Sequence, residues 1–341
     1  MARKQTLDDL IDLFTPEIRD AFIAAIQGVN SSAIISDMIA AIEAGDPVRA
    51  FQALGFSPAA MRPLTQTIER AFEAGGVLTG ESFPKYLNTP SGRTVFRFDV
   101  RNSRAEAWLR DHSSGLVTRL TDEARANVRT VLERGMLEGR NPRNIALDLV
   151  GRIDPTTRNR IGGIVGLTAN QETWVASARR RLTELDDAYF GMELRDKRFD
   201  RTVARAIADG RPLPVETIEK LTIAYKNNAL RYRGESIART EAVQSLNRSE
   251  NEAYMQAVDL GAVDRNSTRR FWDTAGDSRV RWSHKRMEAQ EVGLDEPFVS
   301  PSGARMMHPG DTSLGASADE VVMCRCRVRM KVDFLSGWND D

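Results

Sequence analysis

The chain contains 341 residues, of which 41% are apolar and 28% are charged, so it can bury a substantial core and has the length of about two compact units. Lysine plus arginine equal aspartate plus glutamate at 48 each, which excludes a global field that would draw the protein onto nucleic acid or an acidic membrane. The start of the chain lacks the apolar core of a secretory signal and no apolar run reaches the roughly 18 residues of a membrane span, so we expect a soluble, cytoplasmically made protein without a membrane partner.

The first predicted element is an amphipathic helix over residues 7–26, because apolar residues recur there at helical spacing and form one stripe. This stripe must be covered, and we expect it to offer a docking surface for another protein. Asp46 and Ser57 are each followed by a proline, which predicts two further helix starts with a side-chain cap. Around residues 95–100 apolar and polar residues alternate, which predicts a short strand.

The middle of the chain is predicted to be an all-helical array. Thr121 is expected to cap a helix that stops at Gly139. Asn141 and Asp154, each followed by proline, are expected to open the next two helices. Longer helical patterns, separated by glycine, proline or charged joints, cover residues 169–185, 199–208, 215–232 and 235–260.

After Gly261, short elements with clustered glycine and proline predict a second domain. Its last element is the clearest strand, since residues 322–334 place apolar side chains and both cysteines on one face by alternation. The other face carries the cations Arg325, Arg327, Arg329 and Lys331. The predicted fold class is mainly α: a helical N-terminal region over 1–92, a helical array with one short strand at its start over 93–261, and a small α+β module over 262–341.

The first cluster with candidate chemistry is the Ile-Ala-Arg-Thr-Glu segment at residues 237–241, expected at the start of the last long helix. Helical spacing keeps Arg239 and Glu241 on different faces. Two solvated or inter-helix-paired charges explain them without a dedicated role.

The second cluster begins with a strand that ends at Trp272, followed by a turn and a helix capped by Asp277. This helix carries Arg279, Arg281 and His284. Asp277 fits a cap better than a catalyst. His284 can bind a metal or serve as a hydrogen-bonded structural histidine.

The third cluster is Cys324 and Cys326, with His284 and His308 distant in sequence. Residues i and i+2 of a strand point the same way, so both thiolates can reach one zinc ion, completed by a histidine and Asp277. Core packing explains the cysteines without a metal, and their separation does not favour a disulfide. The expected cofactor is therefore none, with zinc as the alternative.

The cationic face of the last strand, like Arg179, Arg180 and Arg181, can contact DNA phosphates or an acidic partner. A solvated edge strand kept from aggregating by its charge explains the same face. The sequence contains no glycine-rich phosphate loop, nucleophile elbow or zinc-protease helix.

In their order, these clusters and the Pro309-Gly-Asp turn resemble the C-terminal module of Mu F-like phage head morphogenesis proteins, over about the last third of the chain. By this resemblance the motif positions are Arg239, Glu241, Trp272, Asp277, Arg279, Arg281, His284, Cys324 and Cys326. One departure is the absence of the glycine that the family pattern has soon after the histidine. No appended toxin domain is expected after the last strand.

The resemblance implies a minor capsid protein in the virion head, near the portal vertex, that acts in head assembly and in DNA packaging or delivery. It implies the portal protein and the major capsid protein or scaffold as partners, with local contact to phage DNA, and a structural role rather than an enzyme. The alternative is a metal-dependent hydrolase or nuclease with Asp277, His284 and the two cysteines as ligands and Glu241 as base. Thiolate ligands suit phosphate chemistry poorly.

Overall fold

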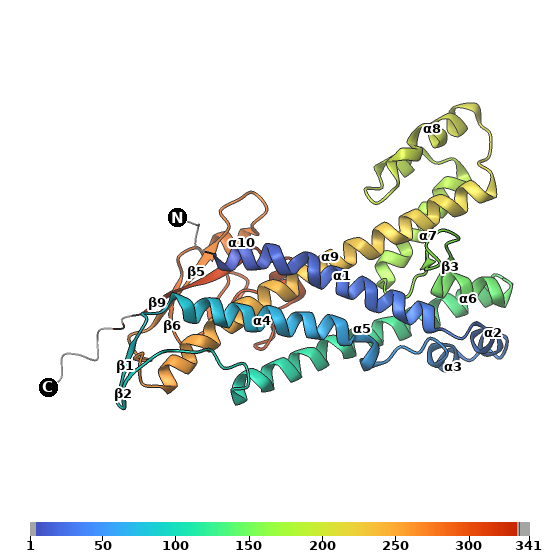
Figure 1. The fold of residues 1–341 in the computed structure, drawn as a ribbon. Helices are drawn as coiled ribbons and strands as arrows, with labels where there is room; N and C mark the ends of the chain where they lie inside the picture. Colours follow the sequence, from blue (N-terminus) through green and yellow to red (C-terminus); the bar gives the residue numbers. More distant parts are fainter. Residues whose placement is uncertain (1–4, 333, 335–341) are drawn as a thin grey trace. The chain divides into compact units, whose positions relative to one another are not determined.

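The computed structural model describes residues 5–332 and 334. In this part of the chain the predicted fold class, mainly α with a small α+β module at the C-terminal end, is confirmed (Figure 1). The α-helices are α1 (Leu7–Ser32), α2 (Ile35–Glu43), α3 (Pro47–Gln52), α4 (Arg62–Ser82), α5 (Ser103–Leu137), α6 (Pro142–Val150), α7 (Ala169–Glu184), α8 (Asp200–Asp209), α9 (Val215–Asp259), α10 (Trp282–Lys285) and α11 (Ala318–Val321). The strands are β1 (Leu87–Thr89), β2 (Gly92–Thr94), β3 (Arg152–Ile153), β4 (Arg160–Ile161), β5 (Arg269–Thr274), β6 (Glu291–Gly293), β7 (Phe298–Val299), β8 (Arg305–Met306) and β9 (Cys326–Lys331).

The described residues form two compact units, each assembled from separate stretches of sequence. The first unit takes its residues from Met1–Asp20, Leu64–Ser113 and Glu235–Asp341, and the second from Ala21–Pro63 and Ser114–Gly234. Helices α1, α4, α5 and α9 contribute residues to both units. The division at residues 92/93 and 261/262 stays a prediction. Within the described residues, no single helix has the length and apolarity to cross a bilayer, although α1 and α2 together, bent by 73°, meet both requirements.

The apolar stripe predicted on the first helix forms on α1 and is buried in the protein's own core. In the first unit Leu10, Phe14 and Ile18 are at most 6% exposed. Ion pairs of 3.0 Å from α4 to Glu17 and of 3.2 Å from Arg19 to α9 hold these helices side by side (Figure 1). The stripe therefore finds its partner inside the chain, and the expected docking surface on it is wrong.

Three of the predicted N-caps are confirmed. The Asp46 carboxylate accepts hydrogen bonds from the first backbone N–H groups of α3, and Asn141 does the same for α6. Ser57 opens a short 3-10 helix, Pro58–Met61, that runs directly into α4.

Two predicted caps are wrong. Thr121 lies inside α5, where its hydroxyl donates to the carbonyl oxygen of Val117 at 2.7 Å. The helix starts much earlier, after Asn102, whose side-chain oxygen accepts from the next turn. Asp154 forms the turn of the β3–β4 hairpin, since its carboxylate accepts from Thr157 N at 2.7 Å. Local sequence shows an acceptor at both places but not whether a helix follows.

The strand predicted over residues 95–100 is also wrong. The pairing strands β1 and β2 lie just before it, and residues 95–100 are not part of a strand. The side-chain amide of Gln256 takes the place of a strand partner, because it accepts from Asp99 N and donates to Asp99 O, both at 2.9 Å. The alternation of apolar and polar residues still identifies a buried side chain, since Phe96 packs against Phe83 with ring centroids 4.9 Å apart.

The two last long helices predicted in the middle region are one continuous helix, α9. Gly234 lies inside it and does not end it. A glycine in a helix costs only about 1 kcal/mol relative to alanine, and burial on both sides outweighs that cost. Within the second unit Arg233 is 6% exposed and donates to the carbonyl oxygen of Gly166 at 2.6 Å.

The C-terminal module is built on a three-stranded antiparallel sheet in the order β6-β5-β9, to which the β7–β8 hairpin is added. The strand predicted over residues 322–334 is shorter than expected, because Met323 has a left-handed φ of 57° and β9 begins only at Cys326. Its apolar face is confirmed. Met330 and Phe334 pack on a buried core that contains Phe83 and Tyr254.

Candidate functional site

Residues 237–241 and Asn247 lie in the middle of α9, where they anchor the backbone around the two cysteines. The hydroxyl of Thr240 accepts from Met323 N at 3.0 Å, and Arg239 Nε approaches Cys324 O at 3.5 Å. Asn247 is fully buried and accepts from Val328 N at 2.9 Å. One face of α9 therefore fixes the path of the chain into β9.

The other charges of this segment pair between helices. Glu241 is 2% exposed and its Oε2 lies 2.5 Å from Nε2 of His112 on α5. Arg239 lies 3.5 Å from a carboxylate oxygen of Asp12 on α1. The two side chains thus contact different helices, in line with their expected separation on the helix surface.

The second cluster surrounds the same backbone from the opposite side. Trp272 is fully buried on β5, opposite Val328 of β9. Arg281 donates to the carbonyl oxygen of Val322. The helix expected from Asp277 onwards is wrong in extent: α10 covers only Trp282–Lys285, and Asp277 instead accepts from Arg279 N at 2.9 Å in a turn.

His284, Cys324 and Cys326 converge in the space between α10 and the start of β9, and we refer to them as the His–Cys cluster. Nδ1 of His284 lies 3.5 Å from Sγ of Cys324 and 3.4 Å from Sγ of Cys326. The three residues are at most 2% exposed. Trp272 lies edge-on against the His284 ring at a centroid distance of 5.0 Å.

Glu320 covers the other side of the imidazole. Its Oε2 is 3.0 Å from Nε2 of His284, without the alignment of a hydrogen bond. The hydroxyls of Ser283, Ser300 and Ser302 donate to its carboxylate at 2.9, 3.3 and 2.5 Å. Burial alone would raise the pKa of Glu320, but these hydroxyls and His284 outweigh it and hold the pKa below the usual value.

The two cysteines titrate as a pair. A hydrogen bond from Cys326 stabilises the Cys324 thiolate and, together with His284, lowers the pKa of Cys324 against the effect of burial. The same hydrogen bond and burial raise the pKa of Cys326, which keeps its proton. The cluster therefore holds one thiolate readily and is a soft sulfur and nitrogen donor set.

The order Cys324–His284–Glu320 also has the arrangement of a nucleophile, a base and an orienting carboxylate. A nucleophile must meet its substrate, and Cys324 is fully buried. The geometry therefore suits a buried structural centre better than covalent catalysis.

His308 and Asp277 do not join the cluster. His308 is 2% exposed and its Nδ1 lies 3.1 Å from Pro309 O, at the wall of a separate cavity of about 320 Å³ in the first unit. Burial lowers its pKa to about 4. Asp277 is 2.7 Å from Arg325.

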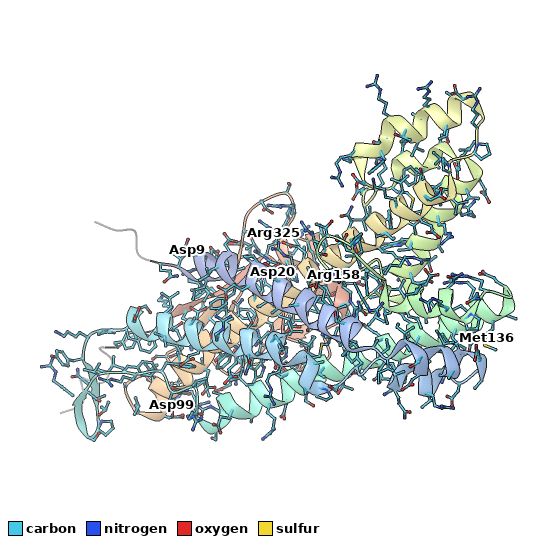
Figure 2. All side chains as sticks on the ribbon, turned by 45° about the vertical axis from the view of Figure 1, so that its right-hand side comes forward. Asp9, Asp20, Asp99, Met136, Arg158 and Arg325 are labelled. Atoms are coloured by element: carbon cyan, nitrogen blue, oxygen red, sulfur yellow. The ribbon has the colours of Figure 1, made fainter. Side chains whose placement is uncertain are left out.

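The four cations on one face of β9 fall into two groups: two are paired with carboxylates and two are exposed. Arg325 pairs with Asp277, and Arg327 lies 2.7 Å from Asp273 and 2.8 Å from Asp8 of α1. Figure 2 labels Arg325 and, near the start of α1, Asp9. Arg329 stacks on the ring of Phe271 in β5 and is exposed, as is Lys331.

Sequence reasoning missed two buried residues of the module. Glu320 had no motif signal. Arg270 is fully buried and donates to the carbonyl oxygens of Gly293, Glu296 and Met307, which ties the end of β6 with the turn after it and the segment after β8 to β5. Its position two residues before Trp272, on the same strand face, is the signal that could have revealed it.

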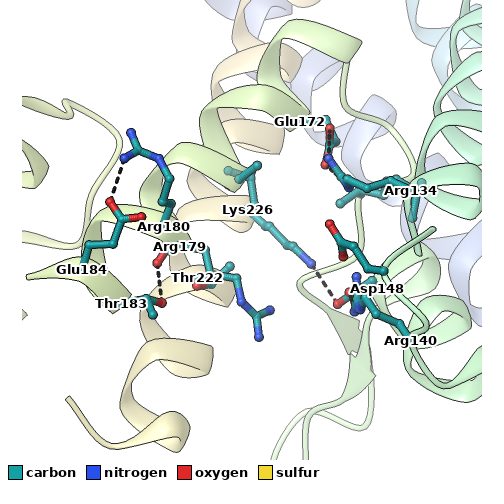
Figure 3. A pocket seen from close by; sticks show the side chains of 15 residues that line it. Arg134, Arg140, Asp148, Glu172, Arg179, Arg180, Thr183, Glu184, Thr222 and Lys226 are labelled. Atoms are coloured by element: carbon teal, nitrogen blue, oxygen red, sulfur yellow. Dashed lines mark hydrogen bonds and ion pairs between the residues drawn. The ribbon is translucent and has the colours of Figure 1, made fainter. Parts of the chain in front are cut away.

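The second unit contains a cavity of about 470 Å³ whose charged lining is largely self-paired (Figure 3). Lys226 lies 3.4 Å from Asp148, and the guanidinium of Arg180 lies 2.8 Å from Glu184. Arg179 also lines this cavity, while Arg181 donates to Ala188 O. Of the predicted arginine triplet, two members therefore face the cavity and the third is bonded to the backbone.

The described residues thus form a mainly helical protein with a small α+β module around a buried His–Cys cluster. Residues 197–329 match the model of the family described as phage Mu protein F like protein, so this segment is similar to the Mu F-like phage head morphogenesis proteins. The match includes α8 and α9 as well as the C-terminal module. Comparison with curated proteins gave no match, and neither did comparison with solved structures.

Proposed function

We propose that the protein is a minor head protein at the portal vertex of a tailed phage, where it acts in head assembly and in DNA packaging or delivery. The observation that carries the proposal is the Mu F-like match over a segment in which α9 is hydrogen-bonded to the chain around the two cysteines. These hydrogen bonds hold α9 and β9 together and leave the exposed surface for partners. The expected partners are the portal protein and the major capsid protein or scaffold.

The test is to mix the full chain with the portal protein of its own phage and to measure the mass of the complex by light scattering after size-exclusion chromatography. A complex of defined stoichiometry, and the presence of the chain in purified heads, would support the proposal. A folded chain that forms no complex with portal, capsid or scaffold protein and is absent from heads would contradict it.

Local contact with DNA is part of the proposal and concerns the end of β9. Arg325 and Arg327 are occupied by carboxylates, which leaves the exposed Arg329 and Lys331 for phosphates. Reversing both charges to glutamate should weaken DNA binding and reduce the salt slope by roughly 0.9 per lost phosphate contact. Unchanged DNA affinity across a salt series would remove this contact.

A further inference from the structure

We infer that His284, Cys324 and Cys326 bind one zinc ion, which fastens α10 to the start of β9. The inference goes beyond the head-vertex role and does not depend on it. It rests on the position of three donor atoms, on the carboxylate behind the histidine and on the way the surrounding backbone is fixed.

The two nitrogen–sulfur distances in the His–Cys cluster match those around a tetrahedral zinc ion. Zinc binds sulfur at about 2.3 Å and nitrogen at about 2.0 Å, which places neighbouring sulfur and nitrogen ligands roughly 3.6 Å apart. The two measured distances from Nδ1 of His284 to the sulfurs are 3.5 and 3.4 Å. All three ligand atoms lie within 4.8 Å of one another.

Both buried sulfurs compete for one hydrogen-bonding position on the histidine, and without a metal Cys326 can instead hydrogen-bond to Cys324. Both sulfurs approach the same nitrogen, Nδ1 of His284, and a ring nitrogen offers either one lone pair or one proton. One of the two buried sulfurs would therefore lack a histidine partner. A metal ion between the three atoms would contact all of them directly; its binding would release the proton of Cys326, and two thiolates with a neutral imidazole would then balance its charge.

The surroundings of His284 are those of a metal-binding histidine. A ligating imidazole usually directs its second nitrogen toward a carboxylate, which fixes the tautomer and the ring orientation. Here Nε2 faces Oε2 of Glu320 at 3.0 Å, and three serine hydroxyls fix that carboxylate. Glu320 contacts the far side of the ring, so it is a supporting residue and not a ligand.

The backbone that presents the cysteines is held from three directions. Thr240 binds Met323 N, Arg239 approaches Cys324 O, and Arg281 donates to Val322 O. The left-handed backbone at Met323 turns Cys324 toward His284 before the strand begins. Three protein donors leave one tetrahedral position, which a water molecule can fill.

The first measurement is the zinc content of the full-length chain, purified under reducing conditions, by inductively coupled plasma mass spectrometry. About one zinc ion per chain is expected in the wild type, and less than a tenth of that in Cys324→Ser and Cys326→Ser. His308→Asn is the matched control, because it replaces a buried histidine outside the cluster, and it should keep its zinc.

Cobalt substitution keeps the inference testable even where a serine variant does not fold. Co²⁺ added to reduced, folded, zinc-free wild type should give thiolate charge-transfer absorption and the d–d bands of a tetrahedral site. Removing zinc with a chelator should also lower the melting temperature, by several degrees in the wild type and in His308→Asn alike.

Three results would overturn the inference. These are a folded, reduced wild type that takes up neither zinc nor cobalt, zinc retained when both cysteines are serine, or a native disulfide between Cys324 and Cys326. Each is independent of portal binding, so failure of the zinc site and failure of the head-vertex role are distinguishable.

Discussion

Nε2 of His112 on α5 and Oε2 of Glu241 on α9 lie 2.5 Å apart, inside the first unit of the protein. The imidazole ring of His112 also stacks on the ring of Trp108, with the ring centroids 4.5 Å apart, so two contacts fix this side chain. A motif carboxylate that might have served as a base is thus bonded between two helices.

Replacing His112 with alanine should destabilise the protein by about 1–3 kcal/mol, because the change removes a hydrogen-bond partner from a buried carboxylate. Urea denaturation measures the loss. Asp111→Ala is the control, since its pair with Arg110 is exposed and should contribute less than about 0.5 kcal/mol. Equal effects of the two substitutions would show that the His112–Glu241 contact does not support the fold.

Asn247→Ala should free the start of β9 from α9. The side chain accepts from Val328 N and donates to Val243 O at 2.7 Å, and both contacts are buried. Hydrogen exchange at Val328 should become faster, with a loss of roughly 1–3 kcal/mol in stability. Asn228→Ala, which removes a hydrogen bond to Leu194 O in the second unit, should leave exchange at Val328 unchanged.

Arg270→Met should cost about 2 kcal/mol or more, because it takes a donor from three partly buried carbonyl groups at about 1 kcal/mol each, while Gly293 O keeps its hydrogen bond from Glu296 N. Arg269→Met is the matched control on the same strand. Arg269 is partly exposed and lies 3.6 Å from Glu291, so its loss should fall within about 0.5 kcal/mol. Thermal unfolding compares the two, and a small effect of Arg270→Met would contradict the role assigned to it.

Glu250→Gln should stabilise the protein at neutral and alkaline pH. Burial raises the pKa of Glu250 to about 8, and its Oε2 has no hydrogen-bond partner among the described residues. A carboxyl whose pKa is raised on folding contributes stability that is present below its ordinary pKa and is lost as pH rises through the folded value. The melting temperature of the wild type should therefore fall relative to Glu250→Gln up to about pH 8.

The range above about pH 7.5 isolates this effect, because His308, with its pKa lowered to about 4, is then largely neutral in both the folded and unfolded states. Glu73→Gln, at an exposed position of α4, serves as the control and should give a curve parallel to the wild type. A wild-type curve parallel to that of Glu250→Gln would show that Glu250 is ionised in the folded protein.

The sequence by itself determined the elements whose signals are local. Helical spacing gave the stripe of α1, caps such as Asp46 and Asn141 gave the starts of α3 and α6, and alternation gave the apolar face of β9. These signals are set by backbone geometry and by side chains within a few residues. The motif residues were found in the same way, as patterns along the chain.

Only the tertiary structure decided what those residues contact. It buried the stripe of α1 inside the chain, carried α9 through Gly234, and gave Asp99 a side-chain partner in Gln256 instead of a strand. It also brought His284 to both cysteines and left His308 outside their cluster. The physical reason is that burial and long-range hydrogen bonds, contributed by segments far apart in sequence, outweigh local preferences of about 1 kcal/mol or less.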